Sequence, residues 1–107
     1  MSNWTPVCAL TDIAPNTGVC ALHDGEQVAL FRRGESESVY AVSNYDPIGK
    51  ANVLSRGLIG SLQDRIVVAS PLYKQHFDLT SGECLEQEDT SIKVYPIRVN
   101  EGQIELG

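Results

Sequence analysis

The chain has 107 residues, which is enough for one domain rather than two, and we expect residues 1–107 to fold as one domain. Hydrophobic residues make up 42% of the sequence and charged residues 21%, a composition typical of globular proteins. With 8 Lys and Arg against 14 Asp and Glu, the formal net charge of −6 excludes a basic surface for nucleic acid or an anionic membrane.

Short apolar runs separated by turn signals predict a series of β-strands along the chain. The runs, in chain order, are residues 7–10, 19–22, 27–32, 39–43, 65–69, 76–79, 83–85, 93–99 and 103–106. Asp24-Gly25 predicts a hairpin, because glycine tolerates the positive φ of such turns. Residues 11–14 suit one helical turn capped by Thr11 or Asp12, and Pro96 predicts an edge strand or a bulge. Strands this short and close together predict an all-β sandwich or small barrel.

Localisation and redox state follow from simple counts. The apolar run at residues 66–73 is too short to span a bilayer, as is every other uncharged run, and the first residues do not resemble a secretory signal. Cys8, Cys20 and Cys84 are odd in number and widely spaced, which argues against a disulfide framework and a zinc site. We therefore expect a cytoplasmic protein in which each cysteine is a small, buried apolar side chain.

Two segments do not fit plain strands, residues 44–60 and residues 70–76. Neither has a disordered composition, and long ordered loops in compact domains are usually functional. Elsewhere the sequence contains no nucleophile beside a base and no glycine loop for phosphate, so we expect no catalytic residue. The acidic residues near the end of the chain are predicted to form a solvated face: Glu83, Glu86, Glu88 and Asp89.

The two loops carry recognisable motifs. Loop one reads Asp46-Pro47-Ile48-Gly49 and then Leu54-Ser55-Arg56-Gly57; loop two reads Ser70-Pro71-Leu72-Tyr73 and then Phe77-Asp78. These stretches resemble Cys-Pro-His-x-Gly with Leu-Ser-x-Gly, and Cys-Pro-x-His with Phe-Asp, in the loops of Rieske proteins, where two Cys and two His hold a [2Fe–2S] cluster. The resemblance implies an all-β, Rieske-like [2Fe–2S] ferredoxin fold, a small antiparallel sandwich or barrel with a cluster-loop subdomain.

The same resemblance puts Asp46, Ile48, Ser70 and Tyr73 at the four ligand positions. Ile48 has no donor atom, and the other three offer hard oxygens where the cluster needs soft thiolates and imidazoles. We therefore expect no cluster, no metal and no cofactor on this chain. Asp46 is expected instead to accept backbone N–H bonds within its turn.

Two interpretations of the loops remain. They are packed, inert remnants, or they form a docking rim, since exposed aromatic and arginine side chains are typical interface anchors. The predicted rim residues are Tyr45, Lys50, Arg56, Leu72, Tyr73, Lys74 and His76.

Residues 46–51, 54–57 and 70–79 resemble in particular the small subunit of the cytoplasmic, assimilatory NAD(P)H-dependent nitrite reductase. That resemblance implies an accessory, non-catalytic subunit of a heteromeric oxidoreductase. Its partner would be a large subunit that carries FAD, a [4Fe–4S] cluster and sirohaem and reduces nitrite to ammonium in nitrate assimilation. Two alternatives are a Rieske-like electron-transfer ferredoxin with unusual ligation and a β-sandwich interaction module of another oxidoreductase.

Overall fold

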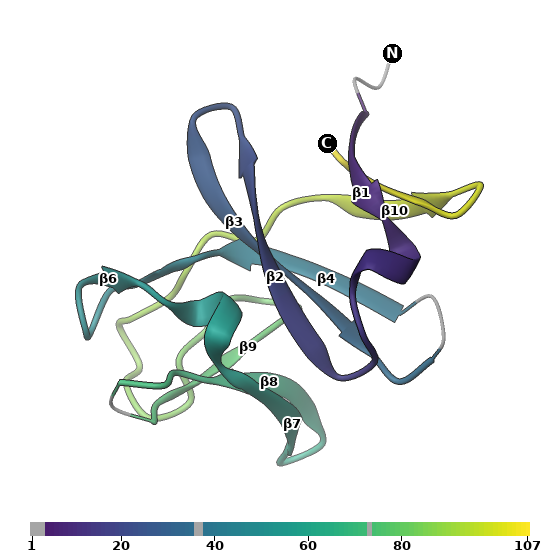
Figure 1. The fold of residues 1–107 in the computed structure, drawn as a ribbon. Coiled ribbons are helices and arrows are strands. Elements are labelled where there is room, and N and C mark those ends of the chain that lie inside the picture. Colours follow the sequence, from purple (N-terminus) through teal and green to yellow (C-terminus); the bar gives the residue numbers. More distant parts are fainter. Residues whose placement is uncertain (1–3, 36–37, 73) are drawn as a thin grey trace.

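The computed structural model describes residues 4–35, 38–72 and 74–107, and strands dominate it (Figure 1). The elements in chain order are β1 (Thr5–Ala9), η1 (Leu10–Asp12), β2 (Thr17–His23), β3 (Glu26–Arg33), β4 (Ser38–Ser43), β5 (Tyr45–Asp46), β6 (Ala51–Asn52), η2 (Leu54–Arg56), β7 (Leu58–Leu62), β8 (Arg65–Ala69), β9 (His76–Asp78), β10 (Ile97–Asn100) and β11 (Gln103–Leu106). All strand pairs are antiparallel, in the orders β1-β11-β10, β2-β3-β4, β5-β6 and β7-β8-β9. The predicted all-β class is confirmed.

The central strand β3 is apolar on both faces because it lies between two cores. Successive side chains of a strand point to opposite faces. Val28 and Leu30 pack into a core with residues of β1 and β11, whereas Ala29 and Phe31 pack into a second core with residues of β8 and β9. The sheet β2-β3-β4 therefore lies between the sheet that contains β10 and the sheet that contains β8 (Figure 1).

Four segments differ from the prediction made from sequence. In place of the predicted strand at residues 83–85, Glu83 and Cys84 form isolated bridges, and β7 was not predicted because its exposed positions include glycine and serine. The last pair of strands begins only at Ile97, since Pro96 has no N–H to donate. The helical turn starts at Leu10, where the Asp12 carboxylate accepts the Ala9 N–H at 3.0 Å.

The cysteine prediction holds in part. All three thiols are free, and Cys84 is buried. Cys8 is half-buried and Cys20 is exposed, so the prediction that each is buried was wrong. Cys20 lies on β2 and points to the same face as the exposed Leu22, opposite to Val19 and Ala21, which pack against a core. Among the residues described, no helix is long and apolar enough to cross a membrane.

Candidate functional site

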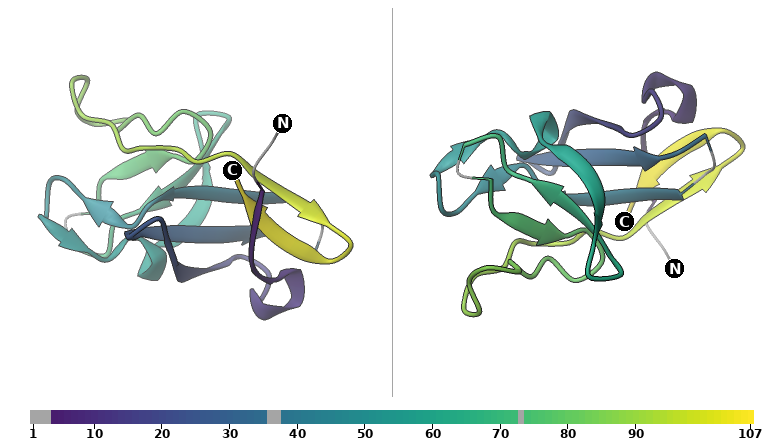
Figure 2. Two further views of the ribbon diagram at one scale, coloured as in Figure 1. Left: turned by 90° about the horizontal axis from the view of Figure 1, so that it is seen from above. Right: turned by 90° about the horizontal axis from the view of Figure 1, so that it is seen from below.

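The two predicted loops lie together at one end of the molecule, where the β5–β6 hairpin sits beside the connection from β8 to β9 (Figures 1 and 2). Asn44, which is 2% exposed, anchors loop one to the central sheet. Its Nδ2 donates to Gln27 Oε1 at 3.0 Å, and its Oδ1 accepts the Ser55 N–H at 2.7 Å. No role for Asn44 was predicted, although an amide residue between a strand and a long loop often bonds to nearby backbone.

The two positions that correspond to cysteines in the Rieske pattern, Asp46 and Ser70, are hydrogen-bonded to each other. Both residues are completely buried, and Ser70 Oγ donates to Asp46 Oδ2. Asp46 Oδ1 accepts the N–H groups of Ile48 at 2.8 Å and Gly49 at 3.0 Å, which confirms its predicted role in the turn. The Leu72 N–H donates to Ser70 Oγ at 3.3 Å. A side-chain hydrogen bond thus joins the two loops directly.

The residues present do not fit a [2Fe–2S] cluster. The oxygens of Asp46 and Ser70 are hard donors that already bond to each other, and Ile48 packs its apolar side chain against the core. A Cβ added to Gly49 would lie 2.4 Å from Leu72 Cδ1, so the two loops are in close contact. Within residues 4–35, 38–72 and 74–107, no group of three His, Cys, Asp or Glu could hold a metal ion.

Several predicted rim residues are exposed on these adjoining loops. Tyr45 is 42% exposed and Leu72 is 45% exposed. Lys50, Arg56 and Lys74 are also exposed. In the described part of the chain, these three basic side chains make no ion pair and no side-chain hydrogen bond. Their charges are therefore available to a ligand or a partner.

His76 and Tyr73 complete the predicted rim. His76 Nδ1 lies 2.6 Å from Glu86 Oε2, and the His76 N–H donates to Glu86 Oε1 at 2.8 Å. Burial alone raises the pKa of Glu86, but the bonds from His76 outweigh it and lower that pKa overall. His76 is thus held against the segment that follows β9. Tyr73 lies outside the described residues.

Asp78 supports loop two from β9. Its Oδ2 accepts Arg65 Nε at 2.6 Å, and its Oδ1 accepts the N–H groups of Thr80 at 2.6 Å and Ser81 at 3.0 Å. Burial raises the pKa of Asp78, but the hydrogen bonds from Ser81, Arg65 and Thr80 lower it overall. The aspartate of the Phe-Asp motif therefore serves the structure of the turn that follows β9.

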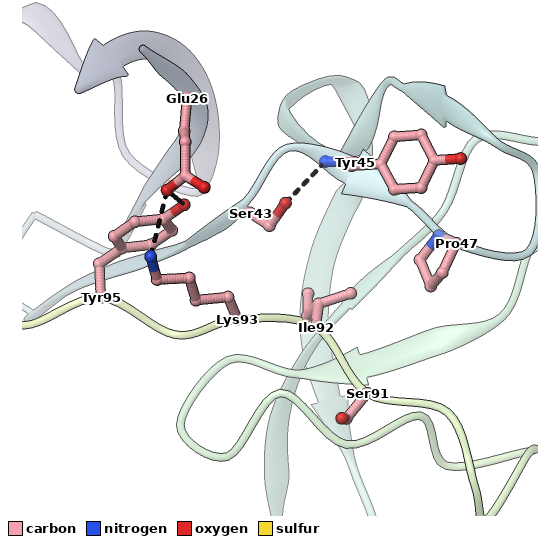
Figure 3. A pocket seen from close by; sticks show the side chains of 8 residues that line it. All are labelled: Glu26, Ser43, Tyr45, Pro47, Ser91, Ile92, Lys93 and Tyr95. Atoms are coloured by element: carbon pink, nitrogen blue, oxygen red, sulfur yellow. Dashed lines mark hydrogen bonds and ion pairs between the residues drawn. The ribbon is translucent and has the colours of Figure 1, made fainter. Parts of the chain in front are cut away.

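A pocket of about 210 Å³ opens between loop one and the segment that precedes β10 (Figure 3). Glu26, Lys93 and Tyr95 gather at one side of it, and Tyr45 and Pro47 lie at the other. Glu26 Oε1 accepts Tyr95 Oη at 2.8 Å and Lys93 Nζ at 3.1 Å. Burial, followed by the bond to Glu26, raises the pKa of Tyr95 to about 12. The Glu26 carboxylate thus already accepts two hydrogen bonds. Through them it links the β2–β3 hairpin to the segment before β10.

Comparison with known proteins identifies the family. The sequence model of the family described as the Rieske-like [2Fe-2S] domain matches residues 3–107 of this chain. A nitrite reductase (NADH) small subunit from Salmonella typhimurium is 53% identical over 106 residues, which cover 99% of this chain and 98% of that protein. The chain belongs to the nitrite reductase small-subunit family. The NMR structure of the E. coli protein NirD matches with a TM-score of 0.91 and 51% identity, over 99% of this chain and 96% of that one.

Membership in this family confirms the resemblance and the Rieske-like fold predicted from the sequence. A further relative is a nitrite reductase [NAD(P)H] large subunit from Klebsiella oxytoca. It is 38% identical over 104 residues, which span 97% of this chain but only 11% of that protein. A domain of this family therefore also occurs within a much longer polypeptide.

Proposed function

We propose that this chain is the non-catalytic small subunit of a cytoplasmic NADH-dependent nitrite reductase and that it acts by binding the large subunit. The observation that carries the proposal is the double occurrence of the domain. It is a separate small subunit in Salmonella typhimurium and a segment of a large subunit in Klebsiella oxytoca. A domain that exists both fused and separate is expected to occupy the same place against the rest of the enzyme.

The redox chemistry belongs, in this proposal, to the large subunit. Cofactors carry such chemistry while the protein supplies orientation and electrostatics. The bond between Asp46 and Ser70 supports the same division of labour, because it occupies positions at which a Rieske ferredoxin needs thiolates. We propose FAD, a [4Fe–4S] cluster and sirohaem on the large subunit, which would reduce nitrite to ammonium in nitrate assimilation.

We also propose that the docking surface is the rim of the two loops. The exposed Tyr45 and Arg56 of the rim support this, since aromatic and arginine side chains are enriched at interfaces. The proposed rim residues are Tyr45, Lys50, Arg56, Leu72, Tyr73, Lys74 and His76. We propose further that residues 1–107 act as one unit, because β3 contributes side chains to both cores.

The experiment that tests the function is reconstitution in trans. The large subunit is purified with and without this chain, and NADH-driven nitrite reduction, complex formation and the iron content of the isolated small chain are measured. We expect a stable complex, restored or stabilised activity, and a colourless, iron-free small chain. Near-stoichiometric iron with visible absorption would support the ferredoxin alternative instead. Failure to bind the large subunit would refute the proposal and favour a module of another oxidoreductase.

A further inference from the structure

The lysine and arginine side chains of this acidic chain differ in whether they bond to other residues of the chain. Of the 8 lysine and arginine side chains, five are engaged within the chain. These are Arg32, Arg33, Arg65, Lys93 and Arg98. Within the described residues, the remaining three, Lys50, Arg56 and Lys74, have neither an ion pair nor a side-chain hydrogen bond. All three are exposed, and all three lie in the two loops at the same end of the molecule.

Two of these lysines end turns of the same design. Residues 46–50 read Asp-Pro-Ile-Gly-Lys, and residues 70–74 read Ser-Pro-Leu-Tyr-Lys. In each turn the lysine N–H donates to the carbonyl four residues earlier, from Lys50 to Asp46 at 2.7 Å and from Lys74 to Ser70 at 3.1 Å. The first residues of the two turns are the buried pair that joins the loops. The two turns therefore stand side by side, each with a lysine at its end.

The backbone at both lysines has a positive φ, which favours glycine over lysine. Lys50 has φ of 58° and Lys74 has φ of 65°, the left-handed region that glycine adopts without strain. Lysine at such a position costs conformational energy that glycine would not, so glycine at either position should not destabilise the turn. Because neither side chain bonds within the described chain, the ammonium groups have no visible role in the fold.

A pocket of about 230 Å³ lies beside these charges. Arg56 and Lys74 line it together with apolar groups. The apolar lining comes from Gly57, Leu58, Ala69 and Pro71. Leu58, on β7, is 77% exposed and lines this pocket, so its side chain is open to a partner. The surface thus offers an apolar recess with cations at its edge.

We propose that this basic, leucine-bordered face, formed by Arg56, Leu58 and Lys74 at the pocket and by Lys50 on the adjoining turn, binds an acidic segment of the large subunit. One apolar side chain of that segment would enter the pocket, and its Asp or Glu side chains would pair with the three free cations. The three unpaired cations select this partner, because a few carboxylates on a short segment can pair with them, whereas the net charge of −6 repels an extended polyanion such as nucleic acid. The inference rests on the proposed function and specifies the chemistry of its interface.

The test uses glycine at both lysines. The double variant Lys50→Gly/Lys74→Gly relieves the backbone strain while it removes both charges, so its urea midpoint should equal or exceed that of the parent chain. Its Kd for the purified large subunit should rise about tenfold or more, with a shallower dependence on salt. The variant Lys50→Arg/Lys74→Arg keeps the charges and should bind like the parent. Gln63→Gly, at an exposed position with φ of 54° between β7 and β8, makes the same glycine change without removing a charge and is the matched control.

The outcomes separate the two proposals. If the parent chain binds the large subunit and the glycine variant binds with the same Kd and salt dependence, the inference is overturned while the proposed function stands. If the arginine variant weakens binding as much as the glycine variant does, charge is not the reason and the inference also fails. If the parent chain does not bind at all, the proposed function itself is wrong.

Discussion

Removal of the Asp46 carboxylate is the most informative perturbation of the loops. Asp46→Ala leaves three donors without their acceptor: the Ser70 hydroxyl and the N–H groups of Ile48 and Gly49. A buried donor left unsatisfied costs about 1–3 kcal/mol, and bonds to a charged group are at the upper end. The Ser70 hydroxyl can rotate toward another acceptor, so not all three donors carry the full cost. We therefore expect the free energy of unfolding to fall by about 3–5 kcal/mol. That is a large share of the roughly 5–15 kcal/mol that stabilises a domain.

Ser70→Ala should destabilise less, by about 1–3 kcal/mol, since it leaves one carboxylate oxygen and the Leu72 N–H unpaired. The two residues bond to each other, so the double variant should lose less than the sum of the single losses. The expected coupling energy is about 1–3 kcal/mol. Circular dichroism during urea unfolding measures all four corners of this cycle.

Exposed residues of the same types provide the controls. Ser61→Ala and Asp89→Ala each remove a side chain with no hydrogen bond among the described contacts, and each should change stability by about 0.5 kcal/mol or less. If the Asp46 and Ser70 losses add to within about 0.5 kcal/mol, the two loops are not joined by this bond and the reasoning is wrong.

Three further predictions concern the support of the loops. Asn44→Ala should lower the free energy of unfolding by about 2–4 kcal/mol, because the hydrogen bonds of this buried side chain to Gln27 and to the Ser55 N–H are lost. A loss below about 1 kcal/mol, measured by urea unfolding, would contradict this. Asp78, with a lowered pKa, stabilises the fold above its unfolded pKa of about 3.9, and this stability is lost as pH falls through the folded pKa. Unfolding midpoints measured across that acid range should therefore fall less steeply for Asp78→Asn, and equal slopes would refute the assignment. Gly82→Ala should destabilise by about 2–4 kcal/mol, since φ is +84° and a Cβ would lie 2.1 Å from the Ile92 oxygen; thermal unfolding at the parent temperature would disprove it.

Strand periodicity and turn chemistry were readable from the chain alone. Asp24-Gly25 forms the hairpin between β2 and β3, and Gln103–Leu106 is the final strand as predicted. Contiguous residues encode such features, because the backbone angles of a turn depend on its own side chains. The loss of soft donors at positions 46, 48 and 70 was equally a matter of residue identity.

Tertiary structure decided which residues meet. Asp46 and Ser70 are 24 positions apart, and only the stacking of sheets brings their side chains into contact. Neither the bond of Asn44 to Gln27 nor the exposure of Cys20 on an edge strand could be read from local sequence. The residue pattern predicted an all-β domain, and the resemblance to Rieske proteins placed residues without soft donor atoms at the four ligand positions. The packed chain determined that a hydrogen bond now joins the two loops, because proximity between distant segments is a property of the whole fold.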